Sequence, residues 1–308
     1  MFFLHLLEKI RSPFGDALMY LVTLFGYETL FMVIALVFFW CVDKKRGYYL
    51  LFAGFSGVIC VQLLKMLFRI PRPWVLDPEL TIVERARESA TGYSFPSGHT
   101  QCAVTLYGGI ARSSKRRASR IFCIVVAVLV GFSRMYLGVH TPKDVLVSAA
   151  IGVGIVFLLH PAIYGACEKP SKMYLTLGIL LALVVANLLF VNLYPFPSGT
   201  DAANLEDARK VALQLLFVLF GMCIIYPVDT YVLRFKVEAV FWAQLCKLAG
   251  GVALVLALRA LLKAPLNALC GVALGGAIRY FLMVLAAGIL WPMTFRFWGK
   301  LGRKSPRI

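Results

Sequence analysis

The sequence is poor in charge and poorest in acids: 15% of its 308 residues are charged, and 32 basic residues stand against 15 acidic ones. A soluble domain carries about 25% charged residues, so this composition excludes a soluble globular fold. The basic residues form no stripe interleaved with stacking aromatics, which argues against a nucleic-acid partner. Apolar runs of about 20 residues recur along the chain, and each is long enough to cross a bilayer as a helix. The composition therefore predicts an all-α integral membrane protein.

Cysteine pairs and a signal peptide are also missing. The eight cysteines lie in apolar stretches without the paired spacing of disulfide frameworks or zinc sites, and they are interpreted as small buried hydrophobic residues. No small-residue cleavage site follows the N-terminus. Residues 1–16 are instead expected to form an amphipathic helix at the membrane interface, and the absence of glycosylation sequons favours a bacterial membrane.

The hydropathy pattern predicts about nine membrane helices. Their expected ranges are 17–41, 47–69, 97–112, 120–137, 143–166, 172–194, 208–228, 237–262 and 266–292. Basic linkers, including Lys44–Arg46 and the five basic residues of 112–120, alternate with these spans so that they share one side with the basic C-terminal tail. The positive-inside rule makes that side cytoplasmic. The N-terminus and the loops 70–95, 138–142 and 195–207 are then extracytoplasmic.

Three polar segments reach this extracytoplasmic side. In the first, Lys65 precedes Arg72-Pro73 by seven positions; the second is Pro96-Ser97-Gly98-His99; the third runs from Ser133-Arg134 through His140 to Asp144. Hydropathy and charge alone bring all three to the same face of the membrane. Their convergence predicts a single site with three cations, two histidines, a carboxylate, a hydroxyl and a glycine amide.

These residue types suit a phosphate group. Pro71 and Pro73 end the helix that carries Lys65 and leave Arg72 extended. The planar fork of arginine matches two phosphate oxygens, and lysine acts as a point charge. Ser97-Gly98-His99 stands where a loop meets a helix, so free backbone N–H groups and the positive dipole end favour an anion.

His140 and Asp144 are four residues apart. At the start of a helix this spacing lets the carboxylate accept from one ring nitrogen and leaves the other nitrogen free to attack. Each segment alone has an ordinary explanation: a snorkelling cation, a helix cap, a structural hydrogen bond. Phe196-Pro197-Ser198-Gly199 repeats the second segment but continues with threonine in place of His99, and it is interpreted as a loop turn. Only the ordered combination indicates function.

The three segments resemble the signature of the type 2 phosphatidic acid phosphatase superfamily, K-x6-RP, PSGH and SR-x5-H-x3-D, at every specified position. The resemblance implies a six-helix phosphatase core over residues 17–194, with about three additional helices and a basic tail in 195–308. It also implies magnesium-independent phosphoryl transfer without a cofactor. The implied roles fall into two groups. The catalytic residues are His140 as nucleophile, Asp144 as the carboxylate that orients His140, and His99 as general acid. The phosphate-binding residues are Lys65, Arg72, Ser97, Gly98 and Arg134.

A site at helix ends inside a bundle suits an amphiphile, so the expected activity is hydrolysis of a lipid phosphate monoester at the outer face of a bacterial inner membrane, through a phosphohistidine. Arg72-Pro73-Trp74 and the residues 91–95 look similar to bacterial relatives of sphingosine-phosphate phosphatases. The charged loop 74–95 is either a lid or a solvated connector. Three alternatives remain: an undecaprenyl-diphosphate phosphatase, a sugar phosphatase similar to glucose-6-phosphatase, and a lipid transporter. The polar residues Lys247, Arg279, Asn187 and Gln214 are interpreted as helix contacts, with a second cavity as the alternative.

Overall fold

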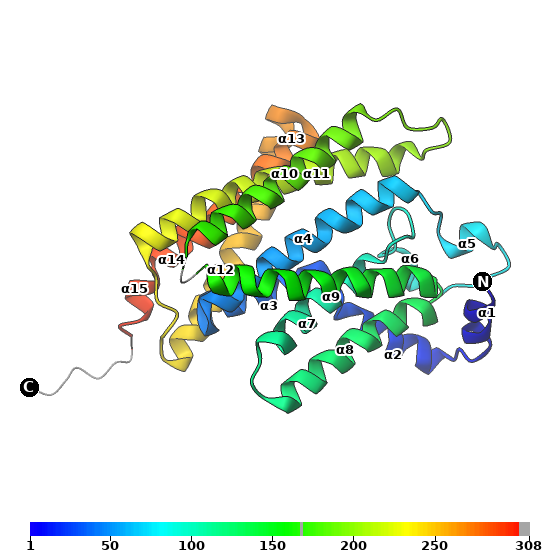
Figure 1. The fold of residues 1–308 in the computed structure, drawn as a ribbon, viewed down its shortest axis with the longest axis horizontal. Helices are drawn as coiled ribbons and strands as arrows, with labels where there is room; N and C mark the ends of the chain where they lie inside the picture. The colour runs from blue at the N-terminus through cyan, green and yellow to red at the C-terminus, as the bar shows by residue number, and fades with distance from the viewer. Residues whose placement is uncertain (167–168, 302–308) are drawn as a thin grey trace, which may run out of the picture. The chain divides into compact units, whose positions relative to one another are not determined.

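The computed structural model describes residues 1–166 and 169–301, and within these ranges it contains helices and turns but no strand (Figure 1). The all-α prediction is confirmed. The interpretation of Cys167 and of the tail residues Arg303, Lys304 and Arg307 lies outside the described residues. Of the other cysteines, Cys102 and Cys123 are buried as predicted, whereas Cys246 and Cys270 are exposed.

The helices of the first half follow the predicted order. They are α1 (Phe2–Lys9), α2 (Pro13–Leu24), α3 (Glu28–Val37), the π-helix η1 (Phe38–Val42), α4 (Lys44–Phe68), α5 (Pro73–Leu76), α6 (Glu84–Arg87), α7 (Gly98–Ser113), α8 (Arg117–Tyr136) and α9 (Pro142–Gly165). Helix α8 packs against both α7 and α2.

The second half begins with α10 (Ser171–Leu193). It continues with α11 (Ala202–Pro227), the π-helix η2 (Val228–Leu233), α12 (Phe241–Leu261), α13 (Lys263–Leu285), the π-helix η3 (Ala286–Leu290), α14 (Trp291–Met293) and α15 (Phe295–Trp298). The repeated FPSG segment forms a turn, in which the amide of Thr200 donates to the carbonyl of Pro197 at 2.9 Å.

The chain divides into two compact units. The first contains residues 1–34, 49–164 and 195–205, and the second contains residues 35–48, 165–194 and 206–308, of which the described part ends at 301. All three polar segments belong to the first unit. The boundary at 194/195 between core and additional helices stays a prediction.

Seven helices among the described residues are long and apolar enough to cross a membrane, or eight if α2 and α3 with η1 count as one bent span. Nine spans are therefore not confirmed. Two of the nine predicted spans are not among the seven helices. The span predicted at 97–112 is α7, which at 16 residues is too short, and the span predicted at 17–41 is broken.

This break separates α2 from α3 with a bend of 46°. Gly26 sits in it, and a Cβ there would lie 2.7 Å from Cγ1 of Val130 and 2.9 Å from the carbonyl oxygen of His99. Only glycine lets the chain pass this close to the first turn of α7. The bend thus places the first predicted span directly beside the second polar segment.

Local sequence explains how the three polar segments are presented. Helix α4 ends at Phe68, and Arg72 follows in an extended conformation between its two prolines, as predicted. Ser97 caps α7 by accepting a hydrogen bond from the amide of Thr100. Asp144 lies in the first turn of α9, directly after the turn that carries His140.

Candidate active site

Arg72 and His140 form the centre of the site. Nη1 of Arg72 lies 2.9 Å from Nε2 of His140, and both side chains are buried. The guanidinium is held in place by the carbonyl oxygens of Thr91, Gly92 and Val139 at 2.5, 2.9 and 3.1 Å. Because arginine has no acceptor, Nε2 of His140 must accept this bond with its lone pair, and the proton of a neutral ring is then on Nδ1.

Asp144 stands on the Nδ1 side of the ring, as the spacing predicted. Its Oδ2 is 3.5 Å from Nδ1 of His140, which is an ion-pair distance rather than a good hydrogen bond. The same oxygen accepts shorter bonds from the Ser94 hydroxyl at 2.6 Å and from the Thr141 amide at 2.8 Å. The carboxylate is therefore fixed by Ser94 and the backbone, and it orients His140 from that position.

Burial keeps His140 neutral. The ring is buried, and the positive charges of Arg72, Arg134 and Lys65 add to this effect, so the pKa of His140 lies well below its ordinary value of 6.5. A neutral imidazole whose Nε2 lone pair points at a guanidinium is in the form that a nucleophile requires.

Arg134 is fully buried at the end of α8. Its Nη1 donates to the hydroxyl of Thr23 on α2 at 2.9 Å, while Nε and Nη2 have no hydrogen-bond partner among the described residues. Its carbonyl oxygen accepts from the amides of Val139 and His140, which shapes the turn that presents His140. Burying arginine N–H donors without an acceptor costs free energy, and a bound anion supplies the missing acceptors.

His99 lies in the first turn of α7. Its ring meets that of Tyr27 edge-to-face, with centroids 4.9 Å apart, and its Nε2 is buried without a partner in the described part of the chain. It is within electrostatic reach of Arg134, His140 and Arg72. Both histidines and the cations of the three segments thus share one site.

The remaining predicted residues border the same space. Nζ of Lys65 donates to the carbonyl of Thr91, which also binds Arg72. The Ser97 hydroxyl is buried and is engaged in the cap of α7, so its observed contacts are structural. A Cβ at Gly98 would meet nothing within 4 Å, which leaves its side of the helix end open to a ligand oxygen.

The arrangement fits a tetrahedral anion. Lys65, Arg72 and Arg134 supply positive charge, and the start of α7 supplies unpaired backbone N–H groups. No group of three or more His, Cys, Asp or Glu side chains placed to hold a metal ion is found in the described ranges. His140 and His99 add two imidazole rings, a side chain that serves other proteins as a nucleophile or as a general acid.

Sequence reasoning missed three residues that complete the site. Ser94 holds Asp144, Thr23 holds Arg134, and Tyr27 packs on His99. Ser94 lies two positions before Pro96, the first residue of the second segment, so its position was a usable signal. Thr23 and Tyr27 come from the first predicted apolar span, where nothing in the pattern marks them.

The loop 74–95 is a wall of the site. Besides the carbonyls of Thr91 and Gly92, its residues Ala86 and Ala90 pack with Leu137 and Val139 next to His140. A loop with this much buried contact is not a solvated connector.

Comparison with known proteins agrees with this geometry. A family model described as the PAP2 superfamily matches residues 46–166, which include all three segments. Residues 46–166 are thus similar to the PAP2 superfamily. No solved structure matches the chain significantly.

Three curated relatives show the range of similarity. Undecaprenyl-diphosphatase BcrC of Bacillus subtilis is 31% identical over 116 residues, which are 38% of this chain and 57% of that protein. Phosphatidylglycerophosphatase B of the same species is 34% identical over 104 residues, 31% of this chain and 50% of the relative. A probable sphingosine-1-phosphate phosphatase of Dictyostelium discoideum is 26% identical over 160 residues, 48% and 38% of the two chains. The matches thus span about half of the length of the two Bacillus relatives.

Proposed function

We propose that this protein is an integral membrane phosphatase that hydrolyses a lipid phosphate monoester through a phosphohistidine, without a metal. The observation that carries the proposal is the lone pair of His140 Nε2, held 2.9 Å from Arg72 in a buried, cationic site. A substrate phosphate that binds Arg72 would meet this nitrogen. The PAP2 superfamily match and the names of the relatives support the same reaction class.

In the first step Nε2 of His140 attacks the phosphorus and forms the P–N bond, while the P–O bond to the lipid breaks. His99 gives a proton to the leaving alkoxide. The charge on the transferred phosphoryl oxygens is stabilised by Lys65, Arg72 and Arg134 together with the Gly98 amide. Asp144, fixed by Ser94, stabilises the positive charge that develops on the His140 ring.

In the second step water attacks the phosphorus from the side that the lipid oxygen left. His99, now neutral, takes a proton from this water, the P–N bond breaks, and the electron pair returns to Nε2 of His140. Inorganic phosphate leaves and both rings are restored. In-line geometry requires His99 and His140 on opposite sides of the phosphorus.

The proposed location is a bacterial inner membrane, and the charge pattern supports a site on its extracytoplasmic side. The basic linkers at Lys44–Arg46 and 112–120 lie at the other ends of the helices that carry the site. A lipid substrate then presents its head group from the outer leaflet while its tail stays among the helices.

A second candidate substrate is undecaprenyl diphosphate, favoured by the 31% identity to an undecaprenyl-diphosphatase. With a diphosphate the leaving group is a phosphate rather than an alkoxide, so it departs with less help from an acid. Replacement of His99 by alanine should therefore slow hydrolysis of a monoester such as phosphatidic acid much more than hydrolysis of undecaprenyl diphosphate. The two candidates are separated by comparing phosphate release from both lipids with that variant.

Phosphate release by the detergent-solubilised protein tests the proposal. The substrates to compare are phosphatidic acid, sphingosine phosphate, phosphatidylglycerophosphate, undecaprenyl diphosphate and glucose-6-phosphate. His140→Ala should abolish release. His160→Ala is a matched control, because the His160 ring packs on Tyr164 and Tyr49, with centroids 4.3 and 5.4 Å away, and no contact with a site residue is found for it in the described part of the chain. Undiminished release by His140→Ala overturns the mechanism, and the absence of release from every lipid overturns the function.

A further inference from the structure

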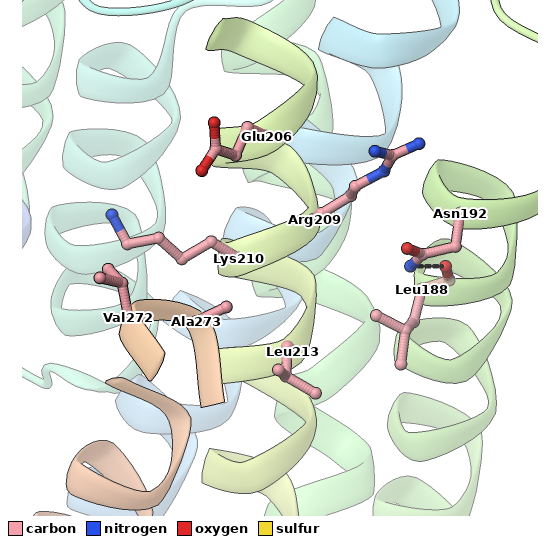
Figure 2. Close-up of a pocket in the computed structure, with 8 residues that line it drawn as sticks. All are labelled: Leu188, Asn192, Glu206, Arg209, Lys210, Leu213, Val272 and Ala273. Carbon is pink, nitrogen blue, oxygen red and sulfur yellow. Dashed lines mark hydrogen bonds between the residues drawn. The ribbon is translucent and has the colours of Figure 1, made fainter. Parts of the chain in front are cut away.

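The second compact unit contains a cavity of its own. It has a volume of about 480 Å³ and lies between α10, α11 and α13 (Figure 2). Its lining residues are Leu188, Asn192, Glu206, Arg209, Lys210, Leu213, Val272 and Ala273. This volume is in the range of small-ligand sites. None of these residues belongs to the three polar segments or to the site described above.

The lining combines an apolar half with a cationic rim. Figure 2 shows Arg209 reaching from α11 toward α10, where Asn192 and Leu188 lie, and Lys210 reaching toward Val272 of α13. Nε of Arg209 donates to the carbonyl of Val191 at 3.0 Å, which fixes the side chain across the two helices. No acidic partner of Arg209 is found among the described residues. Its terminal nitrogens are therefore able to donate to a ligand.

Lys210 makes a weak ion pair within its own helix. Its Nζ lies 3.6 Å from Asp207, and both side chains are largely exposed, so this pair is weak. Glu206 is the one acid in the lining. Two cations against one carboxylate favour a ligand with negative charge.

Helix α13 brings a third source of positive potential. It is interrupted at Gly271, whose φ is +77°, so that a second helical segment begins at Val272 and Ala273 in the cavity wall. A Cβ at Gly275 would lie 2.5 Å from the carbonyl oxygen of Leu266, which shows that the first part of α13 folds back tightly on the second. The N-terminus of a broken membrane helix offers unpaired N–H groups and its dipole to an anion.

The same three helices carry further polar groups outside the cavity lining. Asn187 on α10 is 1% exposed, and neither of its amide atoms has a partner in the described ranges. Gln214 on α11 is one turn beyond Lys210 and lies against Gly276 of α13. Arg279, two turns beyond Val272, has a buried Nε without a partner in the described part of the chain. Polar groups of this kind within membrane helices indicate a functional site more often than a structural one.

The surroundings indicate an amphiphile rather than a free anion. Exposed apolar side chains flank the cavity on these membrane-spanning helices: Leu189 is 53% exposed, Leu269 is 80% exposed and Val272 is 63% exposed. A hydrocarbon chain covers such a surface while its head group reaches the cations. We propose that the cavity between α10, α11 and the second part of α13 binds the phosphate head group of an anionic membrane lipid, at a site separate from the phosphatase site and independent of its reaction.

Lipid binding by the purified, delipidated full-length protein tests this site. Dioleoylphosphatidylglycerol, dioleoylphosphatidylcholine and inorganic phosphate are each added in detergent, and bound ligand is measured by native mass spectrometry and by the shift in melting temperature. We expect tight binding of the phosphatidylglycerol and little effect of the other two. Equal binding of the zwitterionic lipid overturns the proposal, and so does full stabilisation by inorganic phosphate alone.

Two variants and a control complete the test. The double variant R209Q/K210Q should weaken phosphatidylglycerol binding about tenfold or more, because it removes charge-assisted hydrogen bonds. R116Q/R117Q removes the same charge at exposed positions at the start of α8 and should bind as the unmodified protein does. Ala273→Phe fills the cavity without changing charge and should also abolish binding. A folded R209Q/K210Q or Ala273→Phe protein that binds the lipid like the control overturns the site, whatever its phosphatase activity.

Discussion

The hydroxyl of Ser94 offers a direct test of how Asp144 acts. Ser94→Ala removes the 2.6 Å bond to Oδ2 of Asp144, whose side chain is only 2% exposed, so water does not replace the lost donor. A hydrogen bond to a charged group contributes about 1.5–3 kcal/mol. If this contribution is expressed in the transition state, where His140 becomes positive, kcat should fall about 10- to 150-fold. KM should change little, because Ser94 is placed to contact Asp144 rather than the phosphate.

Ser148 provides the matched control. It is as deeply buried as Ser94, and its hydroxyl donates at 2.7 Å to the same residue, but to the backbone carbonyl of Asp144 instead of the carboxylate. Ser148→Ala should keep kcat within about threefold of the unmodified enzyme. The assay is the initial rate of phosphate release over a range of phosphatidic acid concentrations. If Ser94→Ala is as active as Ser148→Ala, the carboxylate is not held by Ser94 and the reasoning fails.

Four other perturbations test the cations, the nucleophile and a buried ion pair. Arg134→Lys should lower kcat/KM about 100-fold, because lysine lacks the planar fork that can donate to Thr23 and to a phosphate oxygen together. Thr23→Ala should lower kcat/KM less. A fully active Arg134→Lys protein contradicts the role of Arg134 in binding the phosphate. Because burial lowers the pKa of His140, the ring stays neutral as the pH falls through 6.5. The value of kcat/KM, corrected for substrate ionisation, should therefore stay constant near pH 6.5 and fall only at lower pH. A fall in kcat/KM centred at pH 6.5 or above contradicts this. Removal of divalent cations with EDTA should leave phosphate release unchanged, and a large loss contradicts charge neutralisation by the three cations. Asp229→Ala should destabilise the protein by about 1–3 kcal/mol, because Asp229 is buried and bonds Lys44, which is partly exposed, at 2.9 Å; an unchanged melting temperature contradicts a stabilising pair.

Hydropathy predicted most helices well because each apolar run has to be buried or face lipid. The span expected at 172–194 is Ser171–Leu193, and the span expected at 120–137 is Arg117–Tyr136. The breaks within spans were not predictable in the same way. Residues 25–27 and Gly271 interrupt runs whose hydropathy is continuous. In the first break Gly26 passes close to Val130 and His99, which are distant in sequence, and in the second Gly271 adopts a φ of +77°.

The candidate site likewise combines residues that stand out in the local sequence with residues that only the packing of the helices brings together. Charged and polar residues stand out in an apolar sequence, so Lys65, Arg72, Arg134 and His140 could be proposed as site residues from the sequence alone. The supporting residues are held by contacts across long separations, 50 positions from Ser94 to Asp144 and 111 from Thr23 to Arg134. No local periodicity encodes such pairs. Their identity depends on how the helices pack.

The break after Leu24 lets two nearby residues contact two different helices. In a straight helix Thr23 and Tyr27 would lie one above the other on the same face and meet the same neighbour. Across the 46° bend, Thr23 reaches Arg134 on α8 and Tyr27 reaches His99 on α7. The three residues 25–27 therefore join two segments that contact a cation and a histidine of the candidate site, one on each side of the bend.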